Sequence, residues 1–459
     1  MNASPIGRSG VPQKVYPLKG PALAVVLALS IIASTSTWIY IARVLKPQQI
    51  ADAALHQRPR GNLSDLYPRW LGARELLLRG RNPYSPEITR EIQRGYYGRP
   101  INPSLPDDPK DQQGFAYPAY VVFLLAPTIH LPFEIVQTGF RWLLFLLAAA
   151  VAILSLRVLR WRLSPYWIAI VIFAMLGWLP VVQGIKLQQL TLVVAALLAG
   201  SVACVANGWL LPAGVLLALA TIKPQLAWPI VLWLLLWSAS DWRARRKFVF
   251  AFAFIMTILV GGAEFLLHGW LFLFIHAIGQ YHQYTQNQSV LVWMFGSILG
   301  RIAEVVSVVL CGSYIWRVRR EPATSAEFGT AFALVMALAV IVVPMFAPYN
   351  QILLAPAIFV LARSVIGEDE PTLPAIRLAS VIAAMLLAWP WIATVLLSAA
   401  SPWLTPGARN SLWPMPFYSN FILPIFIFGL TWLNLWVTGN WMAGNDQNHS
   451  GLRANAASE

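Results

Sequence analysis

The stretch Gly61–Tyr84, GNLSDLYPRWLGARELLLRGRNPY, interrupts an otherwise apolar chain with a polar, arginine-rich segment. It comes shortly after the first long apolar run, and an acid, Asp65, lies in it among aromatic, proline and arginine neighbours. A polar insert between membrane-length apolar runs predicts a region outside the membrane that the surrounding helices hold in place.

The composition of the 459 residues excludes an ordinary soluble globule. Hydrophobic residues make up 58% of the chain and charged residues only 11%, and the mean hydropathy is +0.61. Apolar runs of about 20 residues, enough for a helix to span a bilayer, recur along the sequence. The chain therefore predicts an all-α polytopic membrane protein, because the strands of a membrane β-barrel would give short, alternating segments.

The net charge of +14 does not come from a compact basic domain. The Lys and Arg residues lie between apolar runs, where they determine which side of the membrane each segment occupies. We therefore predict no nucleic-acid partner. Cys204 and Cys311 fall inside apolar runs, so no disulfide framework is expected.

We predict one membrane domain over 21–438, between cytoplasmic tails at 1–20 and 439–459. The first helix leads outward into an extracytoplasmic loop, 43–132, which is too long to lack structure and should carry interfacial or re-entrant helices. About twelve transmembrane helices are expected. They are 21–42, 133–156, 165–182, 188–206, 209–222, 225–238, 248–267, 290–316, 326–345, 350–363, 373–398 and 418–437.

The arginine-rich segments fix this topology. The apolar stretch 117–131 is short and contains two prolines, and counting it as a span would put the arginines of 157–162 outside. Interpreted as an interfacial piece, it leaves every short arginine-rich loop on the inner side, as the positive-inside rule requires. Within the insert, 71–78 is predicted to be helical, with a stop at Gly80.

This topology brings many polar residues to the outer ends of the helices. Because the topology rests on the arginine loops, their convergence is partly independent evidence for an outward-facing site. The residues are Asp65, Lys186, Gln188, Gln189, Lys223, Gln225, Asn287, Gln288, Ser289, Tyr349, Asn350 and Gln351.

Asp65 is the candidate general base. Transfer of a sugar from a lipid phosphate requires the acceptor hydroxyl to lose its proton, whereas the phosphate leaves without a dedicated acid, so one carboxylate can suffice. The alternative is a structural acid that caps a short helix or pairs with Arg69 or Arg74.

Three cations are candidates for binding a donor phosphate. Lys186 and Lys223 lie next to apolar helix ends, where an unpaired charge is costly. A phosphate at the membrane boundary would neutralise either one, and snorkelling to the lipid headgroups is the alternative. Arg301 is the third candidate, with an ion pair to Glu304 as its alternative.

Other polar groups could contact the sugars. Asn287–Ser289 opens a helix and could receive a phosphate or sugar on its free N–H groups, unless it only caps that helix. His282, near Tyr281 and Tyr284, could touch a sugar. The sequence shows no metal-ligand spacing and no glycine-rich nucleotide loop, so we assign no metal and no cofactor and do not expect a nucleotide-sugar donor.

Several of these segments together resemble glycosyltransferase family 87 over residues 20–365. The resemblance implies a GT-C-like fold with a long first outer loop. It also implies a mannosyl- or hexosyltransferase whose donor substrate is a polyprenyl-phosphate sugar. The matching segments are Ser64–Tyr67, Gly80–Tyr84, Phe115–Pro118, Ala220–Pro224 and Asn287–Ser289, with Arg301.

The resemblance also implies roles for single residues. Asp65 matches the catalytic acid of the outer loop, and Lys223 matches a position near the donor phosphate. The chain departs from the family at Ala119, where a second proline is common, and at 184–189, where a Gly-Gln pair is usual. The residues expected to contact substrate are Tyr67, Tyr84, Gln189, Asn287, Gln288, Tyr349 and Asn350.

We therefore predict an integral enzyme of a bacterial inner membrane, with both termini in the cytoplasm. It would move a hexose, with mannose as the expected sugar, from polyprenyl phosphate to a glycolipid or cell-envelope glycan on the outer side. A transporter or flippase of lipid-linked sugars is the alternative, although the chain shows no internal repeat of the kind that such proteins use. A non-catalytic assembly partner is a third interpretation.

The topology predicts which cysteines an impermeant maleimide reaches in intact cells. A cysteine introduced into 43–132 should react, and one introduced into 157–162 or 243–247 should not, because the arginine-rich loops stay inside. Reaction of the insert only after the membrane has been opened would reverse the predicted orientation.

Overall fold

The computed structural model describes residues 20–57, 64–102, 104–105, 108–285, 288–366 and 374–437. Within these residues all regular structure is helical, which confirms the all-α prediction. The predicted tails, apart from Gly20, lie outside the described residues. The α-helices are α1 (Gly20–Tyr40), α2 (Lys46–Leu55), α3 (Tyr67–Arg79), α4 (Pro86–Tyr97), α5 (Val121–Leu125), α6 (Phe133–Val158), α7 (Pro165–Gly177), α8 (Leu179–Lys186), α9 (Leu190–Ala206), α10 (Leu210–Ala220), α11 (Pro224–Ala239), α12 (Trp242–Leu266), α13 (Trp270–Thr285), α14 (Val290–Val318), α15 (Ala326–Val342), α16 (Ala355–Ile366), α17 (Pro374–Ala400) and α18 (Pro406–Leu412).

Several helical segments are long and apolar enough to cross a membrane. Among the described residues there are six, and the pair α7 and α8, bent by 59°, would make a seventh. Four further apolar helices, α9, α10, α11 and α15, are shorter. A multi-pass membrane protein is therefore indicated, and the number of twelve transmembrane helices stays a prediction. The six segments are Gly20–Leu55, Phe133–Val158, Trp242–Leu266, Val290–Val318, Pro374–Ala400 and Pro406–Val437.

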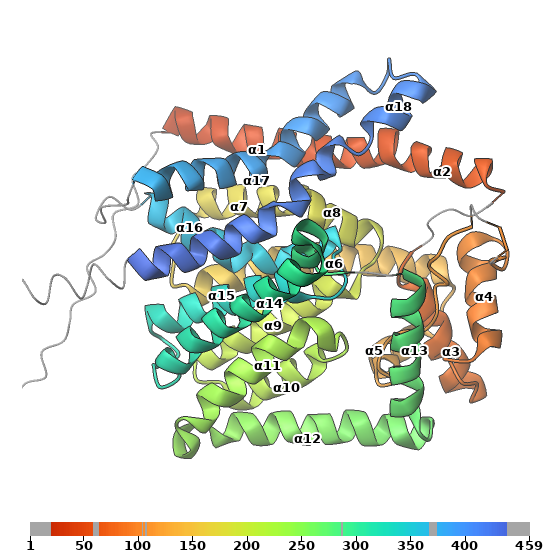
Figure 1. Cartoon of the computed structure of the whole chain (residues 1–459), viewed down its shortest axis with the longest axis horizontal. Coiled ribbons are helices and arrows are strands. Elements are labelled where there is room, and N and C mark those ends of the chain that lie inside the picture. The colour runs from red at the N-terminus through yellow and green to blue at the C-terminus, as the bar shows by residue number, and fades with distance from the viewer. Residues whose placement is uncertain are drawn as a thin grey trace, which may run out of the picture.

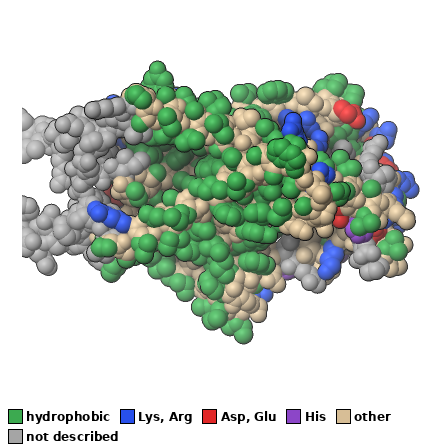
Figure 2. All heavy atoms as spheres, turned by 90° about the horizontal axis from the view of Figure 1, so that it is seen from above, with side chains coloured by type: hydrophobic (Ala, Val, Ile, Leu, Met, Phe, Trp, Pro, Cys, Tyr) green, Lys and Arg blue, Asp and Glu red, His purple; other side chains and the backbone are tan. Residues whose placement is uncertain are grey.

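The helices form a bundle with a polar end. The long helices run along the longest axis of the molecule, whereas α3, α4, α5 and α13 gather at one end, where α4 and α13 run across that axis (Figure 1). Hydrophobic side chains cover the middle of the face in Figure 2, and charged side chains gather at the end that holds α3 and α4. The insert thus lies beyond the apolar part of the bundle.

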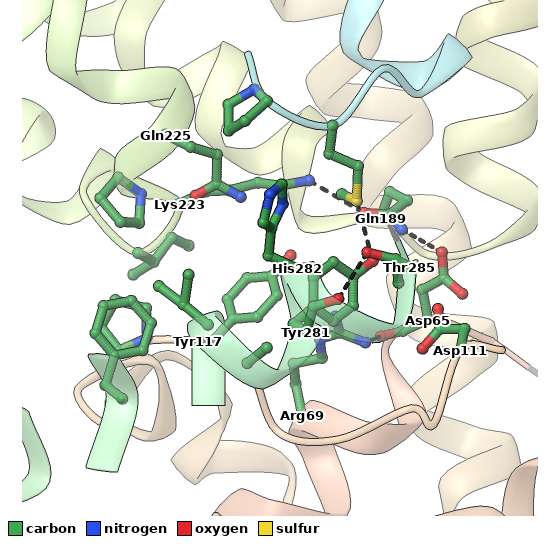
Figure 3. Close-up of a pocket in the computed structure, with 18 of the residues that line it drawn as sticks. Asp65, Arg69, Asp111, Tyr117, Gln189, Lys223, Gln225, Tyr281, His282 and Thr285 are labelled. Carbon is green, nitrogen blue, oxygen red and sulfur yellow. Dashed lines mark hydrogen bonds between the residues drawn. The ribbon is translucent and has the colours of Figure 1, made fainter. Parts of the chain in front are cut away.

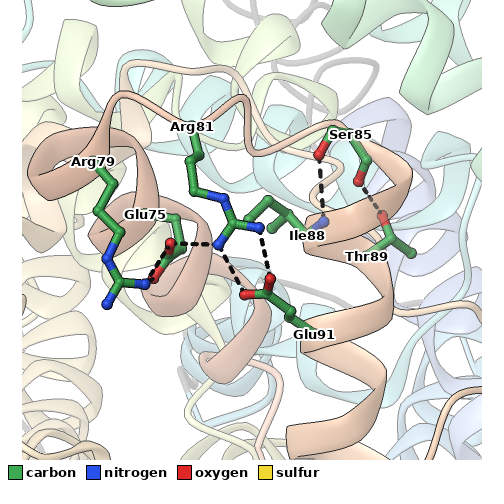
Figure 4. A network of polar contacts seen from close by, with 7 residues as sticks. All are labelled: Glu75, Arg79, Arg81, Ser85, Ile88, Thr89 and Glu91. Carbon is green, nitrogen blue, oxygen red and sulfur yellow. Dashed lines mark hydrogen bonds and ion pairs between the residues drawn. The ribbon is translucent and has the colours of Figure 1, made fainter.

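Ion pairs join α3, the helix of the insert, to α4, which follows it (Figure 4). The carboxylate of Glu75 on α3 accepts from Arg79 at 2.9 Å and from Arg81 at 2.8 Å. Arg81 also pairs with Glu91 of α4 at 2.6 Å. Because the Glu75 side chain is only 4% exposed, the two arginines compensate a carboxylate that burial alone would penalise. The network fixes α4 against α3.

The helix predicted over 71–78 extends over Tyr67–Arg79. Gly80 follows it with φ +65°, a left-handed conformation in which glycine ends helices at low cost. The apolar stretch 117–131 forms only the five-residue α5 and a short 3₁₀ turn. Five residues rise about 7.5 Å, far less than the roughly 30 Å of a bilayer core, so α5 cannot span it.

Close contact between α10 and α12 depends on a glycine. A Cβ atom added to Gly214 would lie 2.5 Å from the carbonyl oxygen of Phe248 and 2.8 Å from the main-chain nitrogen of Phe252. These atoms belong to a helix backbone and cannot move aside as a side chain can. Small residues allow helices to approach this closely within membranes.

Gly214→Ala should therefore lower the melting temperature of the detergent-purified protein, with a cost of about 1–3 kcal/mol from overpacking. Gly261→Ala on α12 is the matched control, because a Cβ atom there meets nothing within 4 Å. The control should melt at the same or a higher temperature, since alanine favours a helix over glycine by about 1 kcal/mol. Equal melting temperatures for the two variants would contradict the described α10–α12 contact.

Candidate active site

A cavity of about 210 Å³ lies at the polar end of the bundle. Its wall comes from α3, the loop after α4, the start of α11, the inner face of α13 and the segment 344–349 (Figure 3). It combines charged groups with apolar side chains such as Ile222 and Phe274. The charged and amide side chains that line it are Asp65, Arg69, Asp111, Gln113, Gln189, Lys223 and Gln225.

Asp65 is held at the cavity by contacts from three parts of the chain. Its main-chain N–H donates to the carbonyl of Leu187 at 2.9 Å. One carboxylate oxygen accepts from the Tyr96 hydroxyl of α4 at 3.3 Å, and the other accepts from the side-chain amide of Gln189. The carboxylate therefore lies in the cavity wall in a fixed orientation.

Lys223 lies between α10 and α11 and is 2% exposed. Its ammonium group donates to Thr191 at 2.5 Å and to the side-chain oxygen of Gln189 at 3.4 Å, and it lies 5.1 Å from the ring centre of Tyr349. Burial, together with the charge of Arg69, lowers the pKa of Lys223 to about 7. One amide, that of Gln189, thus connects the carboxylate of Asp65 to this buried cation.

Arg69 is a second cation at the cavity. Its guanidinium group donates to the main-chain carbonyl of Asp65 at 2.8 Å and lies 4.6 Å from the ring centre of Tyr117, a cation–π distance. Among the described residues, its buried Nε–H has no hydrogen-bond partner. The structure therefore shows Arg69 bonded to the backbone of Asp65, while the carboxylate itself is held by Tyr96 and Gln189.

Comparison with known proteins identifies the family of the chain. The model of glycosyltransferase family 87 matches residues 115–344, which is half of the chain. The chain belongs to this family. Searches of curated proteins and of solved structures found no match. The protein is therefore a glycosyltransferase, and the resemblance stated from its sequence is confirmed.

The family 87 match includes Lys223 and leaves Asp65 outside its range. The cavity joins the two, since both line it and Gln189 bonds to each. The matched region thus supplies most of the cavity wall, and the insert contributes the acid.

Of the other residues predicted from the sequence, only some lie near this glycosyltransferase cavity. Tyr349 lines it, and Asn350 lies behind it, where its side-chain oxygen accepts from Thr191 at 3.1 Å. Tyr84 lines a second, smaller cavity and donates to the carbonyl of Tyr117 at 2.6 Å. Tyr67 packs against Trp70 and Phe133.

Two predicted phosphate-binding cations lie away from the cavity that the structure describes. Lys186 donates to the side chain of Gln49 at 2.5 Å, towards α2. Arg301 is exposed on the apolar helix α14. Neither side chain is among those that line the cavity. Gln288 accepts from the N–H of Phe346 through its main-chain oxygen, at 3.2 Å, and Asn287 lies outside the described residues.

The cavity also contains residues for which the sequence predicted another role or none: Arg69 was expected only as an ion-pair partner of Asp65, and Asp111 was not considered. Arg69 lies four residues after Asp65, a spacing that puts both on one side of a helical turn, and this was the available signal. Asp111 follows a proline-rich stretch that carried no signal. His282, considered only as a sugar contact, does line the cavity with Tyr281. Among the described residues, no three His, Cys, Asp or Glu side chains come together as metal ligands.

Proposed function

We propose that this glycosyltransferase transfers a hexose, with mannose as the expected sugar, from a polyprenyl-phosphate donor. The acceptor would be a glycolipid or cell-envelope glycan at the outer face of a bacterial inner membrane. The observation that carries the proposal is the connected set Asp65, Gln189 and Lys223, in which one carboxylate and one buried cation meet at a single cavity.

Asp65 would act as the general base. The acceptor oxygen attacks the anomeric carbon and passes its proton to the carboxylate, while the bond from that carbon to the phosphate oxygen breaks. The electron pair leaves with the polyprenyl phosphate, which needs no proton from the protein. A single displacement of this kind inverts the configuration at the anomeric carbon.

Lys223 and Arg69 would bind the phosphate. Charge-assisted hydrogen bonds strengthen as the leaving phosphate gains negative charge, and they are stronger in a site that excludes water. Lys223 is almost completely buried, and the buried Nε–H of Arg69 has no hydrogen-bond partner in the part of the chain that the structure describes. A bound phosphate would also favour the protonated form of Lys223.

The apolar part of the wall supports a lipid-linked donor. Phe274 and Ile278 of α13 line the cavity, whereas Phe272 and Ile275 of the same helix are 79% and 59% exposed. An exposed apolar helix face beside the site is suited to contact with lipid. A polyprenyl chain could therefore lie along α13 while its phosphate reaches Lys223.

Asp65→Asn should retain the fold and donor binding but reduce transfer by about 10²–10⁴-fold, since the amide cannot accept the proton. The measurement is mass spectrometry of the hexosylated product formed from polyprenyl-phosphate mannose by the purified enzyme. Glu87→Gln, which alters an exposed carboxylate on α4, is the control and should transfer normally. Near-normal transfer by Asp65→Asn would remove Asp65 from the mechanism. Movement of the carrier across vesicles without a new glycosidic bond would favour a transporter.

The pKa of Lys223, about 7, predicts a pH dependence. The lysine is charged below this value and neutral above it, so kcat/KM for the donor should fall about tenfold per pH unit above pH 7. Lys223→Arg should remove the fall, because arginine stays charged. Lys110→Ala, at an exposed lysine outside the cavity, should keep the original profile. An unchanged profile in Lys223→Arg would assign the titration to another group.

A further inference from the structure

A second carboxylate, Asp111, lines the same cavity as Asp65. The two side chains lie close together at one end of it, next to Arg69 (Figure 3). Burial raises the pKa of Asp111, and the neighbouring charge of Asp65 acts in the same direction. One general base is sufficient for the proposed transfer, so Asp111 is an additional acid that the reaction itself does not require.

Helix α4 contacts both acidic residues through two consecutive tyrosines. The Tyr96 hydroxyl donates to the carboxylate of Asp65 at 3.3 Å, and the Tyr97 hydroxyl donates to the main-chain carbonyl of Asp111 at 2.8 Å. Both tyrosines are buried, and their rings pack edge to face with centres 4.9 Å apart. The contacts of Tyr96 and Tyr97 therefore help to determine how Asp65 and Asp111 lie relative to each other.

The loop that carries Asp111 is fixed from both sides. Gln93 of α4 donates to the carbonyl of Gln112 at 3.1 Å, and the N–H of Gln113 donates to one carboxylate oxygen of Asp111 at 2.8 Å. This bond from a main-chain N–H to the Asp side chain two residues earlier forms an Asx turn, which uses only one of the two carboxylate oxygens. The carboxylate nevertheless lines an open cavity, where its oxygens can accept further hydrogen bonds.

Aromatic side chains border this end of the cavity. Tyr281, one of its lining residues, packs edge to face with Tyr284, with ring centres 5.4 Å apart. Tyr284 reaches the second cavity, which lies on the other side of the loop with Gln112 and Gln280 in its wall. Aromatic rings beside carboxylate and amide groups match a molecule with apolar C–H faces and many hydroxyls.

We infer that Asp111 is a specificity-determining residue, which binds the hydroxylated end of the acceptor through two neighbouring hydroxyl groups. Two adjacent hydroxyls donate to the Asp111 carboxylate, and this contact brings a third hydroxyl to Asp65. A simple lipid alcohol or a single side-chain hydroxyl lacks the pair that Asp111 requires. The inference rests on the proposed function and assigns its acceptor specificity to Asp111.

The test compares three acceptors on the full-length enzyme with polyprenyl-phosphate mannose as donor. Octyl mannoside is the polyol probe, octanol is the simple alcohol, and water is measured as donor hydrolysis. The unaltered enzyme should prefer octyl mannoside. Asp111→Asn should raise the KM for octyl mannoside by at least about tenfold, because the polyol loses a hydrogen-bond acceptor. The KM for the donor, the transfer to octanol and the hydrolysis should stay unchanged, because none of them uses that acceptor. Glu87→Gln is the control and should match the unaltered enzyme.

The outcomes separate this inference from the proposed function. If the unaltered enzyme neither transfers nor hydrolyses the donor, the proposed donor is wrong. If it transfers normally and Asp111→Asn keeps its KM for octyl mannoside, only the role of Asp111 is overturned. Loss of hydrolysis in Asp111→Asn would also overturn that role, because water needs no polyol contact. A further outcome would assign the two acids to a metal instead. Activity would then disappear in EDTA and return with Mg²⁺ or Mn²⁺, and Asp111→Asn would change the metal concentration that is needed.

Discussion

The side-chain amide of Gln189 is the contact on which the site depends. Its N–H donates to the carboxylate of Asp65 and its oxygen accepts from the ammonium of Lys223, so the two ends of one amide hold opposite charges. A direct ion pair would have locked the acid and the cation together and left neither for substrate. The amide keeps both charges at one cavity and leaves the acid open to a proton and the cation open to a phosphate. The two opposite charges thus share one cavity without a direct ion pair between them.

Contacts outside the cavity hold Asp65 in position to bond to Gln189. Asp65 belongs to the insert and Gln189 to the bundle, and the main-chain hydrogen bond from Asp65 to Leu187 joins them. Arg81 pairs with Glu75 of the insert and with Glu91 of α4, and α4 also carries Tyr96, which bonds to the carboxylate of Asp65. A less rigid insert would therefore let the carboxylate of Asp65 move, although the ion-paired side chains themselves do not line the cavity.

The sequence predicted the all-α fold because the length and composition of an apolar run are local properties. It predicted Asp65 and Lys223 on chemical grounds, but it could not predict which neighbours they share. Lys186 shows the reason. Gln188 takes a left-handed conformation, φ +49°, with its side-chain amide bonded to the carbonyls of Ile185 and Lys186 at 2.7 Å each. The chain turns sharply there, so that Gln189 faces the cavity while Lys186 points towards α2.

The cavity wall has an apolar part and a polar part, which would suit the two different substrates of the proposed reaction. Ile222, Phe274 and Ile278 make one part of the wall apolar, as a lipid chain requires, and Asp65 and Asp111 make another part polar, as a hydroxylated acceptor requires. A donor joined to a carrier lipid and an acceptor with a hydroxylated end have opposite solvation needs, so each would enter against the wall that matches it. In the proposed reaction, the reacting atoms would meet where the two parts of the wall join. Gln189 lies at that junction, between the acid and the cation.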